Sequence, residues 1–453
     1  MSVVTESLEA GIQRTGGNPV DFLRNVQYPA FEFPVKGEWS NWRDEQRAWR
    51  ETAVLLDQSH HMVDLFISGP DTIKALTELG VNSMANFGPG VAKQYICVND
   101  DGYFVGDGVL VYLSDGSVNL VSVPSVVNWT HYQMISRGYD VEIIRDDNSN
   151  RRKGAPKVYR YEMQGPAALE IVEAATGTAL PKVKFFHTTE LSIAGCKVTA
   201  IRHGMAGQPG FEFFGDWKDG EKVLEALLKA GEGFGMKRGG AKCYATANVE
   251  SGWIPGPFSA VFGPNEKGYR EWLPAEAYGS LGGSMYSQDV TDYYVTPYDI
   301  GYGRVVKFDH DFVGREALEK IAKEPRRDKV VLHWNAQDVA AALSSWMEPG
   351  LPAKYIELPK SRYAWFQMDT VLKGGDQVGI SMDLGLIPNE SAFISLATLD
   401  LDHCEAGTEV SVLWGEDPVS KKPTVEPHKQ IEVRATVAPW PFAQVVRSTY
   451  REN

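Results

Sequence analysis

The sequence predicts an α+β fold of two or more packed modules, the last of which is mostly β and barrel-like. A chain of 453 residues exceeds the roughly 250–300 residues at which a single hydrophobic core stops growing. Helical apolar periods and period-two strand patterns are mixed up to residue 323. Residues 329–440 instead alternate short strand patterns with Gly-, Pro- and Asp-rich turns.

The first predicted elements follow an aromatic, turn-rich N-terminal stretch. Residues 44–50 have helical composition, and Ser68 or Asp71 can cap a second helix that Gly80 ends. These signals predict two short helices separated by strand-like segments.

Between residues 94 and 123 the apolar period changes to two. Asp-Gly pairs at 101–102 and 115–116 interrupt this pattern, and Asp-Gly between alternating segments is a strong hairpin signal. We therefore expect β-hairpins here, followed by a helix over 126–136 and a strand over 140–144.

A second passage repeats this order of strand, Gly-Pro, helix and strand pairs, which we interpret as an internal structural repeat. Its predicted elements are a strand at 159–164, a helix at 167–175 begun by Gly165-Pro166, strands at 185–194 and 196–202, and a helix at 221–230.

The predicted division of the chain lies near residue 328. A helix at 315–323 precedes a polar, punctuated segment at 324–327 that has the composition of a linker. We expect two repeat-related modules over 1–328 and the β module over 329–453.

Composition and charge exclude several classes of protein. The net charge of −14 repels nucleic-acid phosphates, and the basic run 151–153 follows acidic residues, as in a solvated loop. The N-terminus lacks a signal-peptide pattern, and no apolar run approaches the roughly 18 residues of a membrane span. The four cysteines (Cys97, Cys196, Cys243, Cys404) are far apart, so a reduced cytoplasmic protein without disulfides or structural zinc is expected.

Common catalytic signatures are missing. The sequence holds no GxGxxG opening a helix after a strand, and no GxxxxGK[ST], HExxH or GxSxG. This disfavours hydride transfer, phosphoryl transfer and metal-dependent hydrolysis.

Four other segments are candidates for a site. The adjacent His60 and His61 point to opposite faces of a strand, so a polar cluster near a pocket is favoured over a metal site, which needs further ligands. Glu212, between two phenylalanines, lies either on the solvent face, which composition favours, or buried and paired, for instance with the N–H groups of a heterocycle. Segments 244–255 and 296–318 gather polar and aromatic residues, but each taken singly is compatible with a structural turn.

In these four segments the chain resembles the aminomethyltransferase (glycine-cleavage T protein) family. The pattern at 202–212 is similar to that family's folate segment, with His203 as an extra residue, and 311–318 is similar to its landmark DFIGREAL. Segments 42–50, 57–62 and 250–255 resemble a narrower branch, the tetrahydrofolate-dependent aryl O-demethylases of vanillate, 3-O-methylgallate and syringate, to which dicamba methyltransferases are related.

The resemblance implies three modules around a central folate-binding channel, the third being the C-terminal β module. It also implies the site residues. The catalytic residues are expected to be Tyr244, His61 and Gln58, and the folate-binding residues Gln164, Glu212, Trp253 and Arg202. Expected substrate contacts are Tyr28 and Phe31 in an apolar slot, with His60 or Arg270 as a cation for a carboxylate. Tetrahydrofolate is the implied methyl acceptor, and no metal is expected.

Two departures from the family pattern bear on the reaction. The glycine-cleavage enzymes carry an Asp-Asp pair after the first hairpin, and its first, catalytic member corresponds to Gly106 here, which disfavours the aminomethyl reaction. The vanillate enzyme has a substrate-binding Arg before its Asn-Trp pair, whereas no Arg stands between Leu120 and Asn128. The substrate therefore either lacks the carboxylate or binds it through another cation.

The expected reaction is transfer of a methyl group from a small methoxylated aromatic compound to tetrahydrofolate. Tyr244 is expected to give a proton to the departing ether oxygen, with His61 and Gln58 orienting it or sharing the proton. Two alternatives stay open: an S-demethylase of the dimethylsulfoniopropionate type, and a folate-binding regulatory protein without activity. The sequence predicts no oligomeric state.

Overall fold

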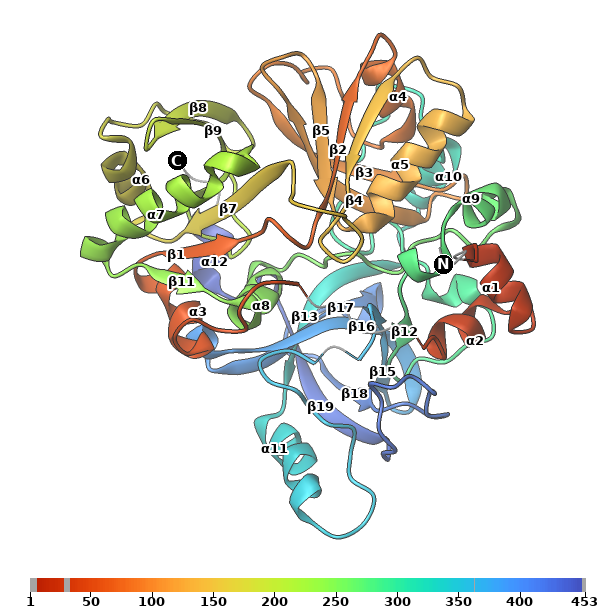
Figure 1. The fold of residues 1–453 in the computed structure, drawn as a ribbon. Helices are drawn as coiled ribbons and strands as arrows, with labels where there is room; N and C mark the ends of the chain where they lie inside the picture. Colours follow the sequence, from red (N-terminus) through yellow and green to blue (C-terminus); the bar gives the residue numbers. More distant parts are fainter. Residues whose placement is uncertain (1–5, 28–32, 362, 450–453) are drawn as a thin grey trace.

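The computed structural model describes residues 6–27, 33–361 and 363–449, and it places two β-sheets beside a closed β-barrel (Figure 1). In the figure the first sheet is orange, the strands of the second run from orange to green, and the barrel is mostly blue.

The first sheet has five antiparallel strands in the order β3-β4-β5-β2-β6. Both predicted Asp-Gly hairpins are confirmed, because β3 turns into β4 at Gly102 and β4 into β5 at Gly116, each with positive φ. The elements of this part are β2 (Val63–Ser68), α4 (Thr72–Leu79), β3 (Ala92–Val98), β4 (Phe104–Tyr112), β5 (Val118–Ser122), α5 (Pro124–Ser136) and β6 (Glu142–Asp146).

The second sheet has the order β11-β1-β7-β10-β9-β8. Its elements are β1 (Val54–Asp57), β7 (Val158–Gln164), α6 (Ala168–Thr176), β8 (Thr188–Ile193), β9 (Cys196–Ile201), β10 (Gly210–Asp216), α7 (Gly220–Gly231) and β11 (Lys237–Gly239). Strand β8 (Thr188–Ile193) is shorter than the strand predicted at 185–194, because Phe186 has a φ of 56° and cannot continue an extended strand. Because β1 lies in this sheet and β2 in the first, residues 58–62 cross from one sheet to the other.

The C-terminal β module is a closed six-stranded barrel, as predicted. Its strands are β13 (Arg327–Trp334), β15 (Asp369–Lys373), β16 (Asp376–Ile387), β17 (Ala392–Asp400), β18 (Glu409–Trp414) and β19 (Ile431–Ala438). The linker before the barrel is one residue shorter than the segment predicted at 324–327, because β13 already begins at Arg327.

Further helices and short strands connect these bodies. They are α1 (Leu8–Arg14), α2 (Pro19–Arg24), α3 (Trp42–Glu51), α8 (Ala241–Ser251), α9 (Lys267–Trp272), β12 (Leu281–Gly282), α10 (Arg315–Ile321), α11 (Ala336–Ser344), β14 (Phe366–Gln367) and α12 (Gln444–Thr449). The 3-10 turns are η1 (Trp217–Asp219), η2 (Glu232–Phe234), η3 (Pro264–Glu266), η4 (Ala275–Ala277), η5 (Val290–Tyr293), η6 (Ser345–Met347), η7 (Pro388–Glu390) and η8 (Leu401–His403).

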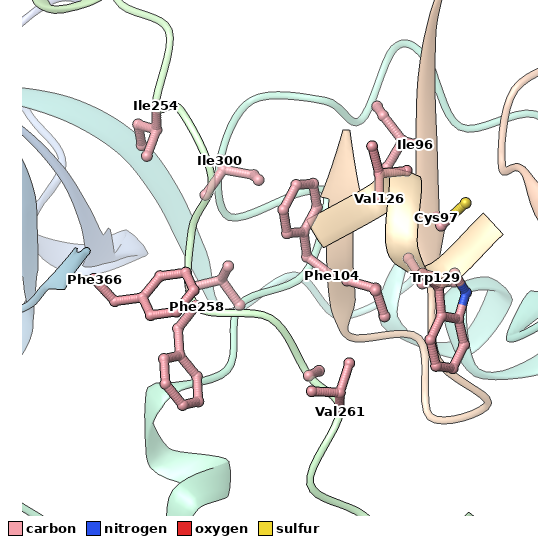
Figure 2. Close-up of a cluster of buried hydrophobic side chains, with 14 of the residues drawn as sticks. Ile96, Cys97, Phe104, Val126, Trp129, Ile254, Phe258, Val261, Ile300 and Phe366 are labelled. Carbon is pink, nitrogen blue, oxygen red and sulfur yellow. The ribbon is translucent and has the colours of Figure 1, made fainter. Parts of the chain in front are cut away.

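One hydrophobic core joins the first sheet to a side of the barrel. Figure 2 shows Phe104 and Trp129 of the first sheet and its helix on one side and Phe366 on the other, with Phe258 between them. The rings of Phe258 and Phe366 meet edge to face, with centroids 5.2 Å apart. The barrel interior and the second sheet have separate cores. The first sheet and the barrel are therefore held together by shared apolar burial.

Among the described residues, none of the helices is both long and apolar enough to cross a lipid bilayer. Within the same residues, no three His, Cys, Asp or Glu side chains are grouped so as to hold a metal ion.

Candidate active site

A cavity of about 1380 Å³ lies where the two sheets, α8 and the barrel meet. Ligand pockets usually measure about 300–1,000 Å³, so this one has room for more than one small ring system. Its wall includes Trp253 and Phe258 from the loop after α8, and Met382 and Leu384 from barrel strand β16. A site with this lining can hold two planar molecules side by side.

Helix α8 brings the expected catalytic tyrosine into this cavity. The hydroxyl of Tyr244 lies 2.9 Å from Nε2 of His61 and 3.1 Å from the Sδ of Met205, and all three residues line the wall. His61 arrives on the segment that crosses between the sheets. The structure thus brings together two residues that are far apart in the sequence, as the resemblance implied.

Gln58, the third expected catalytic residue, lies behind this pair. Its side chain is buried and does not line the cavity, and its Nε2 donates to a carboxylate oxygen of Glu162 and, at 3.5 Å, to the Sδ of Met205. Since Met205 also contacts the Tyr244 hydroxyl, Gln58 can act on Tyr244 only through its neighbours.

Two carboxylates, Glu162 and Glu212, face each other across β7 and β10. Burial, together with the charge of Glu212, raises the pKa of Glu162 to about 8. Glu212 lines the cavity with 5% of its surface exposed, and it accepts a hydrogen bond from Arg160, which also pairs with Asp64 at 2.7 Å. The solvent-face interpretation of Glu212, favoured by composition alone, is therefore wrong.

The loop at 202–209 closes over this carboxylate pair. Gln164, buried beneath the loop, donates to Glu162 and accepts from the backbone N–H of Ala206 at 2.7 Å. A Cβ on Gly204 would lie 2.7 Å from the backbone carbonyl oxygen of Gln208 and 2.6 Å from the side-chain oxygen of Gln164, so only glycine fits there. Arg202 is buried, with its guanidinium carbon 5.5 Å from the ring centre of Phe211. Neither Gln164 nor Arg202 lines the cavity.

Trp253 also lines the wall and leads to a residue that the sequence analysis missed. Its indole N–H donates to the hydroxyl of Tyr302 at 2.7 Å and to Asp107 at 3.1 Å. Burial raises the pKa of Asp107 to about 6, against the effect of its hydrogen-bond donors. Asp107 follows Gly106 in β4, and the period-two pattern of a strand indicates that its side chain faces the side opposite to position 106.

The expected substrate cations do not reach the cavity. His60 does not line the cavity, and its Nδ1 lies 2.8 Å from the hydroxyl of Ser149. Arg270 pairs with Glu9 at 2.6 Å and donates to two backbone carbonyls. The expectation that His60 or Arg270 binds a substrate carboxylate is therefore wrong, because both side chains have other partners and neither lines the cavity. The two expected aromatic contacts, Tyr28 and Phe31, lie outside the described residues.

The structure offers a different cation near Tyr244. Lys360 lines the cavity, pairs with Asp383 of β16, and approaches the side-chain oxygen of Asn248 at 3.3 Å. Asn248 stands four residues after Tyr244, on the same face of α8. Sequence reasoning did not select Lys360, because nothing local in the barrel module connects it to α8.

Comparison with known proteins now identifies the family. A model described as the GCVT N-terminal domain matches residues 12–255, so the chain belongs to the GCVT (aminomethyltransferase) family. It is 44% identical to syringate O-demethylase of a Sphingobium species, over 96% of each chain. It is 30% identical to sesamin methylene transferase of a Sinomonas species, over 89% of each chain.

The fold agrees with this assignment. The structure is similar to glycine cleavage system aminomethyltransferase T from Bartonella henselae, with a TM-score of 0.62 and 17% identity over 93% of this chain and 95% of the other. The predicted α+β fold of this family, with a C-terminal barrel, is therefore confirmed.

Proposed function

We propose that this protein is an enzyme, a tetrahydrofolate-dependent O-demethylase. It moves a methyl group from a methoxylated aromatic compound to tetrahydrofolate and leaves a phenol and 5-methyltetrahydrofolate. The observation that carries the proposal is the contact between Tyr244 and His61 in a largely apolar cavity, in a chain 44% identical to a syringate O-demethylase. The sesamin methylene transferase is likewise named for transfer of a one-carbon group.

The side of the cavity around Glu212 fits reduced folate. A buried carboxylate at the wall can accept hydrogen bonds from the amino and ring N–H groups of a pterin. Nδ1 of His203, also at the wall, has no hydrogen-bond partner among the described residues and offers a further polar contact. Gln164 and Arg202 would hold the loop and the β10 strand in place around the carboxylate, and Trp253 would flank the ring. Tetrahydrofolate, when bound, supplies the N5 nucleophile.

Tyr244 and His61 would act on the leaving group. An aryl ether is inert because a phenol has a pKa of about 10, so its conjugate base leaves slowly. The Tyr244 hydroxyl can donate a proton or a hydrogen bond to the ether oxygen as negative charge develops there. His61, at 2.9 Å, fixes the direction of that hydroxyl and can return the proton. Glu162 and Gln58 support the pair from behind through Met205.

The remaining wall would receive the aromatic substrate. Apolar residues from α8's following loop and from β16 form a slot, and Lys360 with Asp383 adds a charged pair one helical turn from Tyr244. Such a pair can bind a polar ring substituent such as a hydroxyl or a carboxylate. This arrangement takes the place of the arginine that is missing before Asn128.

One assay tests the proposal. The purified protein is incubated with tetrahydrofolate and a panel of methoxybenzoates, guaiacols and sulfonium compounds, and 5-methyltetrahydrofolate and the demethylated product are measured. We expect both products, in equal amounts, with methoxyaromatics only. Product from a sulfonium compound alone would indicate an S-demethylase, and folate binding without any product would indicate a regulatory protein.

A further inference from the structure

A buried carboxylate stands directly behind the cavity wall, on strand β4. One oxygen of Asp107 accepts three hydrogen bonds, from the hydroxyl of Tyr302 at 2.5 Å, the amide of Gln94 at 2.6 Å and the indole of Trp253 at 3.1 Å. All three donors line the cavity, whereas Asp107 has only 1% of its surface exposed and does not line it. Asp107 can therefore influence a ligand only through these three side chains.

The direction of this side chain follows from the strand. A Cβ on Gly106 would lie 2.7 Å from the backbone nitrogen of Val126, so position 106 faces helix α5. Because successive residues of a strand point to opposite faces, Asp107 points to the cavity side. Position 106, which lacks the family's acid, thus has an acidic neighbour that faces the other side of the strand.

We propose that Asp107 is a positioning residue for the folate side of the cavity, one that holds the indole of Trp253 and the phenol of Tyr302 in place while it is ionised. The inference rests on the proposed function, because the role of Trp253 as a folate contact belongs to that function. An indole N–H can only donate a hydrogen bond, and an ionised carboxylate can only accept them. Protonation of Asp107 removes the negative charge from the oxygen that all three donors share, and hydrogen bonds to an ionised acceptor are roughly twice as strong as those to a neutral one, so all three contacts weaken.

This arrangement makes folate binding sensitive to pH. Burial raises the pKa of Asp107 to about 6. Of the groups that face it, Tyr302 has a pKa held well above its ordinary value by burial and by Asp107, and Gln94 and Trp253 carry no charge. Only Asp107 in this cluster changes charge between pH 5.5 and 8. Affinity for folate should then fall as the pH is lowered through about 6.

The experiment is calorimetric titration with 5-methyltetrahydrofolate between about pH 5.5 and 8, on the wild type and three variants. For the wild type we expect Kd to rise several-fold toward the acid end. For Asp107→Asn we expect a Kd raised about 10-fold at neutral pH, as for the loss of one hydrogen bond to a charged group. The change in Kd centred near pH 6 should disappear, whereas any change near pH 8, where Glu162 titrates beside Glu212, should remain. In steady-state assays this variant should raise the KM for tetrahydrofolate more than it lowers kcat.

Tyr302→Phe separates positioning from a merely structural role. It removes one of the donors that lower the pKa of Asp107, so the midpoint of the pH profile should move to higher pH. Asp146→Asn is the matched control, since Asp146 is also a buried carboxylate of the first sheet, but its partners Arg152 and Lys157 are not part of the cavity wall. It should bind folate as the wild type does.

Several results would overturn the inference. A wild-type Kd independent of pH, an unshifted midpoint in Tyr302→Phe, or wild-type affinity in a folded Asp107→Asn protein would each do so while leaving the proposed function intact. A wild-type protein that binds no reduced folate at all would overturn the proposed function and the inference together.

Discussion

Tyr244 is the residue on which the proposed chemistry depends most directly. Tyr244→Phe removes the hydroxyl that contacts His61 and keeps the ring. We expect kcat to fall on the order of 100-fold or more, because a general acid contributes about 10²–10⁴-fold, while the Kd for folate changes little. The measurement is the rate of 5-methyltetrahydrofolate formation beside a calorimetric titration. Tyr132→Phe, outside the cavity, is the control, and unchanged turnover in Tyr244→Phe would remove Tyr244 from this role.

Glu212 should act on binding rather than on turnover. Glu212→Ala removes the carboxylate at the folate side of the cavity and leaves Arg160 with Asp64 and Asn119. Hydrogen bonds to charged groups contribute about 1.5–3 kcal/mol, so we expect the Kd for reduced folate to rise by roughly 10- to 100-fold. Calorimetric titration measures it, with exposed Glu190→Ala as the control. Since Arg160 is buried, Glu212→Gln is the second variant, and wild-type affinity in both would refute the assignment.

Single residues also show how far the sequence can predict the site. The expectation that His60 and His61 stand on opposite faces of a strand is wrong, because both lie in the turn between β1 and β2, and only the fold decides that His61 faces the cavity. Tyr244 was placed by resemblance, since a contact across 183 residues has no local signal. Lys360 was missed for the same reason. Asp107 could have been found from the sequence, because alternation along β4 places its side chain on the face opposite to that of position 106.

At the scale of elements, helix α8 needs a rigid support to present Tyr244. Glu250, at its end, accepts hydrogen bonds from Trp49 at 2.9 Å and from Arg50, both of α3. Glu250→Leu leaves Arg50 paired with Glu390 alone, at 2.8 Å, and leaves the buried indole N–H of Trp49 without its acceptor. An unsatisfied buried donor costs about 1–3 kcal/mol. We expect the unfolding temperature, measured by scanning calorimetry, to fall by several degrees.

A surface ion pair within α3 is the matched control for the prediction on Glu250→Leu. Arg47 and Asp44 form a pair in which both side chains are about half exposed. Exposed pairs contribute about 0–1 kcal/mol, so Arg47→Ala should leave the unfolding temperature nearly unchanged. An equally small effect of Glu250→Leu would show that α8 does not depend on α3.

The elements differ in how well local sequence determines them. The hairpins at 101–102 and 115–116 were predicted correctly, because Asp-Gly pairs fix a turn locally. The segment between α8 and α10 consists largely of short turns whose place is set by burial against both the first sheet and the barrel, as for Phe258. Local periodicity carries no signal for such packing.

The whole molecule is organised around the cavity, to whose wall residues on both sides of the division predicted at residue 328 contribute. That boundary stays a prediction, because the first sheet and the barrel share one core, in which Phe366 of the C-terminal region contacts Phe258. A sequence pattern can indicate that a barrel follows, but not which of its faces is buried against the preceding sheet.

Because both sheets and the barrel contribute to the cavity wall, we expect a bound ligand to stabilise all three of them together. The cavity wall combines Glu212 of the second sheet, Val121 of the first and Leu384 of the barrel. A ligand at 100 times its Kd stabilises the folded state by about 2.7 kcal/mol, and because each body contributes to the site, that stabilisation should reach each of them. Hydrogen exchange with 5-methyltetrahydrofolate should therefore slow in peptides covering β5, β10 and β16. Glu212→Ala at the same ligand concentration should lose this protection. If protection stayed within residues 1–328 in the wild type, the barrel would be no part of the binding site.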